Sequence, residues 1–326
     1  MNRIIFTCGD INGVGTEICI KTINKIYKNE KRKIILFCPH NILRSTFEIV
    51  KPRFSYTLTE RLNSSAGKPN EVIIVNTGLY IHTPGVATKD SGKAAYRALQ
   101  LALQNIGYKS DILITAPISK QALQLAGKNF PGHTEILASY SKTKNFMMLF
   151  LSNKMICGLS TIHEPVKKIS GLITKSRVKN SLEVLKHSLI HDLNIKNPSI
   201  AVLGLNPHAG ENGKIGMEEI KFIKPVIDSL KDKKIQGPFV PDAFFANHLY
   251  KKFDAVLGMY HDQVLIPFKM LNFDKGVNFT AGLPFVRTSP DHGTGFDIAG
   301  KGIANADSMI QAVKWAELIA RNRKLN

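Results

Sequence analysis

Apolar residues in this chain follow two patterns, short continuous runs and longer stretches in which apolar positions recur with a helical period. A short apolar run bounded by turn residues is typical of a buried strand, whereas apolar residues three or four positions apart are typical of a helix. The two patterns alternate along the chain. Such alternation predicts the α/β class, with a mostly parallel sheet covered by helices.

Each predicted strand is an apolar run, and the strands are Arg3 to Thr7, Lys33 to Phe37, Glu71 to Asn76, Asp111 to Thr115, Phe146 to Leu151, Ile156 to Thr161, Ser199 to Leu203 and Ala255 to Met259. Each predicted helix has helix-compatible apolar spacing, and the helices are Thr16 to Tyr27, Ser91 to Gly107, Ile118 to Ala126, Thr174 to His191, Met217 to Leu230 and Ala306 to Arg323. Gly107 and Gly127 stand where glycines commonly end helices.

The size and composition of the chain limit its class. With 326 residues, of which 44% are hydrophobic, it can bury a substantial core and fits two domains or one large α/β unit. No run approaches the roughly 18 apolar residues of a membrane span, and Ile4 to Phe6 is too short for a signal peptide. We therefore expect a cytoplasmic enzyme with no membrane partner. Cys8, Cys19, Cys38 and Cys157 have no metal-ligand spacing, which favours reduced, structural thiols.

The formal net charge of +19 raises the alternative of a nucleic-acid-binding protein. The excess lysines are dispersed, for example Lys21, Lys25, Lys167 and Lys234, on predicted helices or turns that would face water. They are not accompanied by an aromatic-interleaved basic stripe or a zinc-finger spacing. We therefore expect no nucleic-acid partner, while the positive field would attract phosphorylated substrates and anionic cofactors.

The turn after the first strand, Cys8 to Glu17, is glycine-containing and leads into a helix, as a dinucleotide-binding fingerprint does. Gly13 and Gly15 are followed by Ile18 where the third glycine belongs, and no acidic residue about 20 positions on closes a second strand. A tight strand-to-helix turn that lines a cleft is therefore favoured over a classical nucleotide site.

The stretch from Asp291 to Asn305 combines glycines with histidine and aspartate just before a predicted amphipathic helix. Long ordered loops are more often functional than not, although a plain surface loop is the alternative. The stretch resembles the adenosine-binding loop of the isocitrate and isopropylmalate dehydrogenase superfamily. That resemblance implies a nicotinamide cofactor, with His292, Gly293, Asp297 and Asn305 as its binding residues.

Three histidines, His163, His208 and His261, each follow an apolar run predicted to be a strand. Open α/β sheets place their ligands beyond the carboxyl ends of the strands. Three imidazoles that converge there could hold a divalent ion while leaving positions open for substrate. Taken singly, a histidine in such a position is more often an ordinary loop residue than a metal ligand, and no short metal-ligand spacing joins these three.

Nearly the whole chain resembles the 4-hydroxythreonine-4-phosphate dehydrogenase family in the order and spacing of several distinctive blocks. These blocks are Gly9 to Asp10, Gly13 to Glu17, Thr115 to Lys120, Gly132 to Glu135, Gly204 to Glu211, Met259 to Gln263 and Gly282 to Gly302. The resemblance implies an isopropylmalate dehydrogenase-like fold of two lobes with a cleft between them. It also implies a homodimer and a role in pyridoxal phosphate (vitamin B6) biosynthesis.

The lobes expected from this fold are a discontinuous nucleotide-binding lobe, residues 1–130 and 275–326, and a metal-binding and dimerisation lobe, residues 131–274. By the resemblance, His163, His208 and His261 bind one divalent ion per site, Zn, Mg or Co. His163 is expected to reach the site of the neighbouring subunit, which places the active sites at the dimer interface.

The same matching assigns a small phosphorylated hydroxy amino acid as substrate, and its binding residues are His133, Thr134, Lys269, Asn278 and Arg287. Lysine and arginine can neutralise phosphate and carboxylate groups, which agrees with this assignment. The implied reaction oxidises 4-phosphohydroxy-L-threonine to 2-amino-3-oxo-4-phosphooxybutanoate, which decarboxylates to 3-amino-2-oxopropyl phosphate. The metal would lower the pKa of the substrate hydroxyl while hydride passes to the nicotinamide.

The base that removes the hydroxyl proton is open among Asp242, Lys269 and a metal-bound water. Asp242 could instead be a helix N-cap, because the residues from Ala243 onward look helical.

Asp297 favours NAD over NADP, because a carboxylate accepts a ribose hydroxyl but repels a 2′-phosphate. Oxidation of threonate or erythronate 4-phosphate stays an alternative. A phosphate acyltransferase of the same architecture is disfavoured by the three histidines. The first loop, with Cys8, Ile11 and Asn12, departs from the family pattern.

Overall fold

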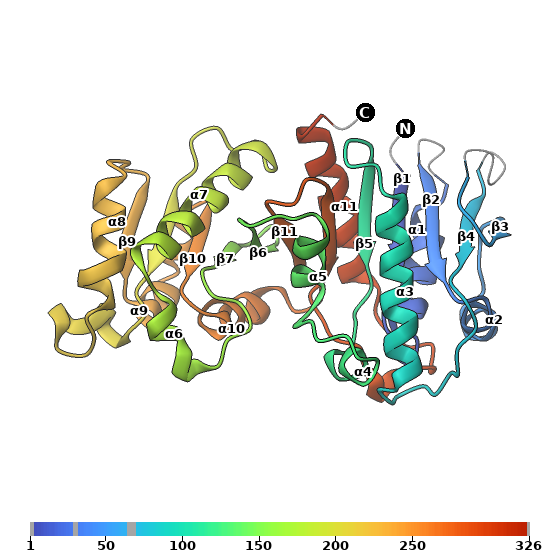
Figure 1. Ribbon diagram of the computed structural model, residues 1–326. Helices are drawn as coiled ribbons and strands as arrows, with labels where there is room; N and C mark the ends of the chain where they lie inside the picture. The colour runs from blue at the N-terminus through green and yellow to red at the C-terminus, as the bar shows by residue number, and fades with distance from the viewer. Residues whose placement is uncertain (1–2, 29–31, 64–69, 325–326) are drawn as a thin grey trace. The chain divides into compact units, whose positions relative to one another are not determined.

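The computed structural model describes residues 3–28, 32–63 and 70–324, and the chain forms two compact units (Figure 1). Unit 1 consists of Met1–Lys142 and Leu283–Asn326, and unit 2 of Thr143–Gly282. The chain therefore leaves unit 1, builds unit 2 and returns. Both boundaries lie later in the sequence than the expected lobe limits after residues 130 and 274.

The strands of unit 1 are ordered β3-β4-β2-β1-β5-β12, and every neighbouring pair is parallel. Their bounds are β1 Arg3–Thr7, β2 Lys33–Cys38, β3 Tyr56–Thr59, β4 Val72–Asn76, β5 Asp111–Thr115 and β12 Val286–Pro290. The central strands are continuous apolar runs because helices cover both of their faces.

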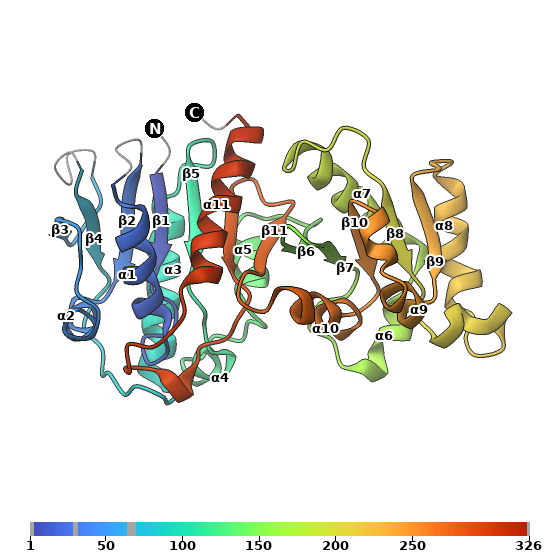
Figure 2. The same ribbon diagram turned by 180° about the vertical axis from the view of Figure 1, so that it is seen from behind.

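Helices cover this sheet on two sides, with α3 on one face (Figure 1) and α1 and α11 together on the other (Figure 2). The helices of unit 1 are α1 Gly15–Ile26, α2 His40–Ile49, α3 Lys89–Asn105, α4 Lys120–Leu125, α5 His133–Tyr140 and α11 Asp307–Asn322, with a short 3-10 turn η4 Phe296–Ile298. The Thr88 hydroxyl caps α3 by accepting a hydrogen bond from the Ser91 N–H.

The strands of unit 2 are ordered β11-β6-β7-β10-β8-β9. Strand β6 runs antiparallel to both β11 and β7, whereas β7, β10, β8 and β9 are parallel neighbours. Their bounds are β6 Met147–Leu151, β7 Ile156–Leu159, β8 Ile200–Leu203, β9 Ile235–Phe239, β10 Ala255–Gly258 and β11 Val277–Ala281.

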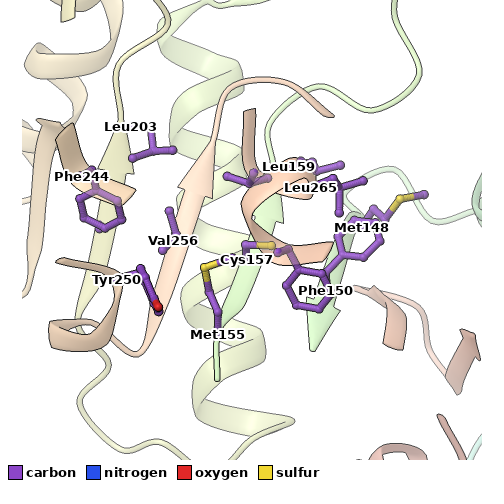
Figure 3. Packing of buried hydrophobic residues seen from close by; sticks show 13 residues of the cluster. Met148, Phe150, Met155, Cys157, Leu159, Leu203, Phe244, Tyr250, Val256 and Leu265 are labelled. Carbon is purple, nitrogen blue, oxygen red and sulfur yellow. The ribbon is translucent and has the colours of Figure 1, made fainter. Parts of the chain in front are cut away.

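The helical elements of unit 2 are α6 Val166–Leu172, α7 Lys175–His191, α8 Lys224–Ser229, α9 Pro241–Ala246 and α10 His261–Asn272, with the 3-10 segments η1 Pro207–Gly213 and η3 Leu249–Lys252 and the π-helical turn η2 Glu219–Ile223. One core joins the strands to α9 and α10, and Figure 3 shows Phe150, Cys157, Val256 and Leu265 packed within it. Burial of these side chains fixes α10 against the sheet.

The predicted α/β class and mostly parallel strand pairing are confirmed, and every predicted strand and helix is present with ends within two residues of those expected. One predicted helix, Met217 to Leu230, is divided into the π-helical turn η2 and α8. Prediction missed β3, β9, β11, β12, α2, α5, α6 and α10, whereas the helical stretch expected from Ala243 onward lies in α9. Many of these are short, and Pro238 in β9 and Pro267 in α10 disguise the usual signals.

All four cysteines are buried and free, as the sequence predicted. Among the described residues, the helices fall short of the length and apolar character that crossing a membrane requires.

Candidate functional site

Three neighbouring parallel strands of unit 2, in the order β7-β10-β8, end just before the three candidate metal ligands. His163 follows β7, His261 begins α10 directly after β10, and His208 lies in η1 after β8. Since adjacent strands of a sheet are about 4.8 Å apart, this topology brings the three histidines to one edge.

The rings of His163 and His261 are close, with 5.8 Å between their centroids. The Nδ1 atom of His261 lies 2.6 Å from Oδ1 of Asp262, so this carboxylate orients the ring and leaves Nε2 for a ligand. Among the described residues of one chain, no group of three or more His, Cys, Asp or Glu side chains is arranged to hold a metal. The structure therefore pairs two of the predicted ligands, while His208 shares their edge of the sheet without joining them.

His208 lies in a strained turn. Residues His208 to Asn212 all have positive φ, between 45° and 83°, and for residues other than glycine this costs roughly 1 kcal/mol or more each. The buried Glu219 carboxylate holds the entrance of this turn, because its Oε1 accepts the N–H groups of Leu205 and Asn206 at 2.7 Å each. Strain of this kind persists only where the surroundings enforce it.

Two side chains link the strand ends that lead to the histidines. Gln263 donates from Nε2 to the Gly204 carbonyl over 2.6 Å and accepts from the Met259 N–H at its Oε1 over 2.7 Å. Thr161 donates its hydroxyl to the Met259 carbonyl over 2.7 Å. The ends of β7, β8 and β10 are thus fixed to one another by buried hydrogen bonds.

The other predicted residues of unit 2 lie on three elements. Asp242 is exposed in the first turn of α9, a helix that contacts η1. The N-cap of α9 is Val240, so the alternative of an N-cap role for Asp242 is wrong. Lys269 lies in the last turn of α10. Asn278 lies on β11, and its Oδ1 is buried without a hydrogen-bond partner among the residues described.

In unit 1, a second group of predicted residues surrounds the start of α5. His133 and Thr134 form its first turn, and its N-cap Gly132 provides no side-chain cap. The guanidinium of Arg287, on β12, is buried and donates to the Thr115 hydroxyl from both Nε and Nη2, at 3.1 and 2.7 Å. Uncapped N–H groups and a buried cation together suit an anion.

The charges of this group follow from burial. Burial lowers the pKa of Arg287 to about 9, while the nearby Glu135 charge acts in the opposite direction. Burial also holds the pKa of His133 well below its ordinary value, and repulsion from Arg287 adds to the effect. His133 is therefore a neutral hydrogen-bonding group at neutral pH beside a buried cation.

The four predicted cofactor residues lie in one loop of unit 1, which includes η4 and leads into α11. His292 is partly buried, and its Nδ1 lies 3.0 Å from the Gly293 carbonyl oxygen. Asp297 is exposed, as a group that meets a ligand from solvent must be. The exposed Asn305 accepts the Asp307 N–H at its Oδ1 over 2.8 Å, which directs its amide nitrogen elsewhere.

The turn after β1 packs against this loop. The Val14 N–H donates to the Thr294 carbonyl over 2.8 Å, and a Cβ on Gly13 would lie 2.5 Å from that oxygen. Glycine at 13 thus permits the close approach. The buried Asn12 donates to the Val86 carbonyl over 2.8 Å and accepts the Thr83 N–H over 2.9 Å. The predicted tight turn between β1 and α1 is confirmed, and it contacts the candidate cofactor loop at Thr294.

Sequence reasoning missed Glu219 and Gln263 as residues that shape the site. Both lie in helical segments and bind backbone atoms outside them, at a sequence separation of 14 between Glu219 and Leu205 and of 59 between Gln263 and Gly204. Gln263 does fall in one of the distinctive blocks, which was the available signal. A polar residue buried next to strand ends is recognised only once those ends are neighbours.

A family model described as "Pyridoxal phosphate biosynthetic protein PdxA" matches residues 30–316 of the chain. A 4-hydroxythreonine-4-phosphate dehydrogenase from Sulfurihydrogenibium sp. (strain YO3AOP1) is 37% identical to this chain, and the match covers 99% of this chain and 100% of that protein. One of the same name from Bacteroides thetaiotaomicron is 38% identical, with 90% of its length and 99% of this chain covered.

Solved structures that resemble this chain include an enzyme of the same name. A crystal structure of 4-hydroxythreonine-4-phosphate dehydrogenase from Klebsiella pneumoniae matches with a TM-score of 0.81 and 34% identity, covering 98% of both chains. An isocitrate dehydrogenase from Methylococcus capsulatus matches with a TM-score of 0.53 at 11% identity, covering 100% of this chain and 87% of that one, which shows likeness of fold alone.

Proposed function

Because this chain belongs to the family of the pyridoxal phosphate biosynthetic protein PdxA, and is thereby an oxidoreductase, we propose that it oxidises 4-phosphohydroxy-L-threonine. The product would be 2-amino-3-oxo-4-phosphooxybutanoate, a β-keto acid that loses carbon dioxide to give 3-amino-2-oxopropyl phosphate. The position of His163, His208 and His261 after three adjacent parallel strands, at one edge of the sheet, is the observation that carries the proposal.

The donor set suits one divalent metal ion. Imidazole nitrogens are common ligands of divalent metal ions, which they bind at about 2.1 Å. His163, His208 and His261 would hold it, and Asp262 would keep the His261 ring in its binding orientation. A bound Zn, Mg or Co ion would act as a Lewis acid on the substrate hydroxyl and stabilise the developing negative charge.

Substrate anions would be held by the cationic and polar groups of the predicted set. Arg287, with His133 and Thr134 at the start of α5, forms a buried cationic site for a phosphate or carboxylate. Lys269 supplies a second cation on α10. The unpartnered Oδ1 of Asn278 would accept a hydrogen bond from the substrate's ammonium group, which would remove the cost of burying that oxygen.

The proton and hydride leave by separate routes. A bound nicotinamide would supply the redox chemistry, as the acceptor of hydride from the carbinol carbon. Asp242 and Lys269 are our candidates for accepting the hydroxyl proton. The exposed Asp242 carboxylate, on a helix next to the His208 turn, is the better placed of the two relative to the metal ligands.

The cofactor would bind the loop that carries His292, Gly293, Asp297 and Asn305. The exposed Asp297 carboxylate supports NAD as the preferred form, with NADP the weaker cofactor, because it would repel the additional phosphate.

A homodimer with active sites at the subunit interface completes the proposal. The exposed face of α10 has an apolar stripe that suits a second copy, in which Ile266, Met270 and Phe273 are 59%, 82% and 80% exposed. Within one chain the three histidines do not form a complete ligand group. We therefore propose that each metal site takes His208 and His261 from one subunit and His163 from the other. The four free thiols fit a reducing cytoplasm.

The decisive experiment is a turnover assay on purified protein with 4-phosphohydroxy-L-threonine, NAD and a panel of divalent ions. We expect NADH formation that chelation abolishes and one of the ions restores. Threonate 4-phosphate and erythronate 4-phosphate serve as competing substrates, and a higher kcat/KM with either would overturn the substrate assignment. Metal-independent turnover would overturn the role of the histidines.

A further inference from the structure

Helix α1 holds the candidate cofactor loop near its beginning. Val14 is the N-cap of α1, and its N–H donates to the carbonyl of Thr294 over 2.8 Å. Gly13 packs directly against the same residue. The loop then continues through η4, and Gly300 and Gly302 allow it to turn with φ values of 75° and 72°.

The same helix also holds the end of the loop. Lys21 donates from Nζ to three oxygen atoms: Oε1 of Glu17 at 2.7 Å, the Gly302 carbonyl at 2.8 Å and the Ala304 carbonyl at 2.7 Å. All three ammonium hydrogens are thereby used. The Glu17 Oε1 atom in turn accepts the Ala304 N–H over 2.9 Å. We call this arrangement of Glu17, Lys21, Gly302 and Ala304 the α1 clasp.

The α1 clasp lies in a buried setting. Glu17 is 5% exposed and Ala304 is 4% exposed. The second carboxylate oxygen, Oε2, is buried and lacks a hydrogen-bond partner among the described residues, so neutralisation of this carboxylate rests on Lys21. Ala304 is held through both its N–H and its carbonyl by one ion pair, and the next residue is the predicted cofactor ligand Asn305.

Residues 14, 17 and 21 lie on one face of α1, at the i, i+3 and i+7 spacing of a helix. Figure 2 shows this helix beside α11, into which the loop leads. A rigid helix therefore fixes the loop on both sides of Asp297. A loop held in its binding shape loses less conformational entropy when a ligand binds.

We propose that Lys21, through the α1 clasp, is a positioning residue for the cofactor: it holds the loop in the shape that binds NAD. The proposal rests on the proposed function, because it takes the loop of residues 291–305 as the cofactor site. The ammonium group of Lys21 is fully engaged within the clasp, so Lys21 acts through the loop. Its loss releases the 302–304 backbone and leaves a buried carboxylate without its cation.

The test compares Lys21→Met with Lys25→Met, an exposed lysine one turn further along α1. We expect Lys21→Met to raise KM for NAD and the Kd for NADH roughly tenfold, the effect of losing hydrogen bonds to a charged group. kcat at saturating NAD and KM for the phosphorylated substrate should stay within about twofold of wild type. Lys25→Met should match wild type throughout.

Two further measurements separate positioning from a general loss of stability. The rise in Tm that NAD produces should be smaller in Lys21→Met than in wild type when each is measured relative to its own ligand-free Tm, and hydrogen exchange at the Ala304 amide should accelerate. Glu17→Gln keeps a side-chain oxygen that can accept from both Lys21 and the Ala304 N–H. This variant should bind NADH with an affinity between those of Lys21→Met and wild type. It replaces Lys21→Met if that variant does not fold.

Wild-type protein that binds no NADH would refute the proposed cofactor site itself. Wild-type protein that binds NADH while Lys21→Met and Glu17→Gln bind it equally well would refute the clasp alone. The clasp would also fail if KM for the phosphorylated substrate rose as much as KM for NAD, because the effect would then be general.

Discussion

The side-chain amide of Gln263 lies 2.6 Å from the carbonyl oxygen of Gly204, a residue 59 positions earlier in the chain. With its second bond, to the Met259 N–H, Gln263 connects the strand end before His208 to the strand end before His261. Two candidate ligands are thus held at one edge by a residue that is itself no ligand, and the relationship can be tested directly.

Replacing Gln263 with leucine should leave the Gly204 carbonyl and the Met259 N–H buried without their partner. At about 1–3 kcal/mol for each of the two unsatisfied groups, we expect a loss of roughly 2–6 kcal/mol in the free energy of unfolding. Zinc affinity should fall about tenfold, the lower limit seen when groups that orient ligands are lost. Urea unfolding and calorimetric zinc titration measure both, with exposed Gln121→Leu as control. Unchanged zinc affinity would contradict the linkage.

Sharing of the metal site between subunits can be tested by mixing inactive variants. We expect His163→Ala and His208→Ala each to lose metal-dependent activity. Denatured together and refolded, they should recover about one quarter of wild-type activity, because half of the dimers are mixed and each mixed dimer has one intact site. A mixture of His208→Ala and His261→Ala should stay inactive, since one subunit supplies both. Absence of recovery in the first mixture would place His163 in the site of its own chain, where its ring already lies beside His261.

Wild-type protein should use NAD with a kcat/KM at least about tenfold above that for NADP. Asp297→Ser should reduce this ratio by roughly tenfold, because serine neither repels the 2′-phosphate nor accepts as strong a hydrogen bond from the ribose. Steady-state kinetics with both cofactors measure the ratio. The control is Asp274→Ser, which removes an exposed carboxylate from unit 2. Wild-type preference for NADP by more than tenfold would reverse the assignment.

Acid should destabilise the protein partly through His133. Burial holds its folded-state pKa well below the ordinary value, so between the two values the unfolded chain binds the additional proton. Stability therefore falls as pH falls below about 6.5 and ceases to fall once the folded-state pKa is passed. Urea unfolding at pH 7 and pH 5 should show a smaller loss for His133→Gln than for wild type.

Exposed His40 on α2 offers the matched control for this acid effect, since His40→Gln should retain the wild-type dependence on pH. Superimposable pH dependences for His133→Gln and wild type would show that His133 does not contribute.

Prediction from sequence succeeded where a local pattern decides the outcome. The apolar run of β1 and the one-sided spacing of α7 match the observed elements. Prediction failed for α10 and β9, because each contains a proline that interrupts the local sequence pattern, and tertiary packing overrides that local preference. The histidines could be placed beyond strand ends by sequence alone, because each follows an apolar run.

What the sequence determined by itself was the class of the fold, the ends of its main elements, the set of candidate residues and, through distinctive blocks, the family. Tertiary structure alone decided that β10 lies between β7 and β8, that Gln263 joins their ends, and that Lys21 holds Ala304 from 283 positions away. The physical reason is that propensity and hydrophobic period act over a few residues. Hydrogen bonds between distant segments exist only after the sheet has brought those segments together.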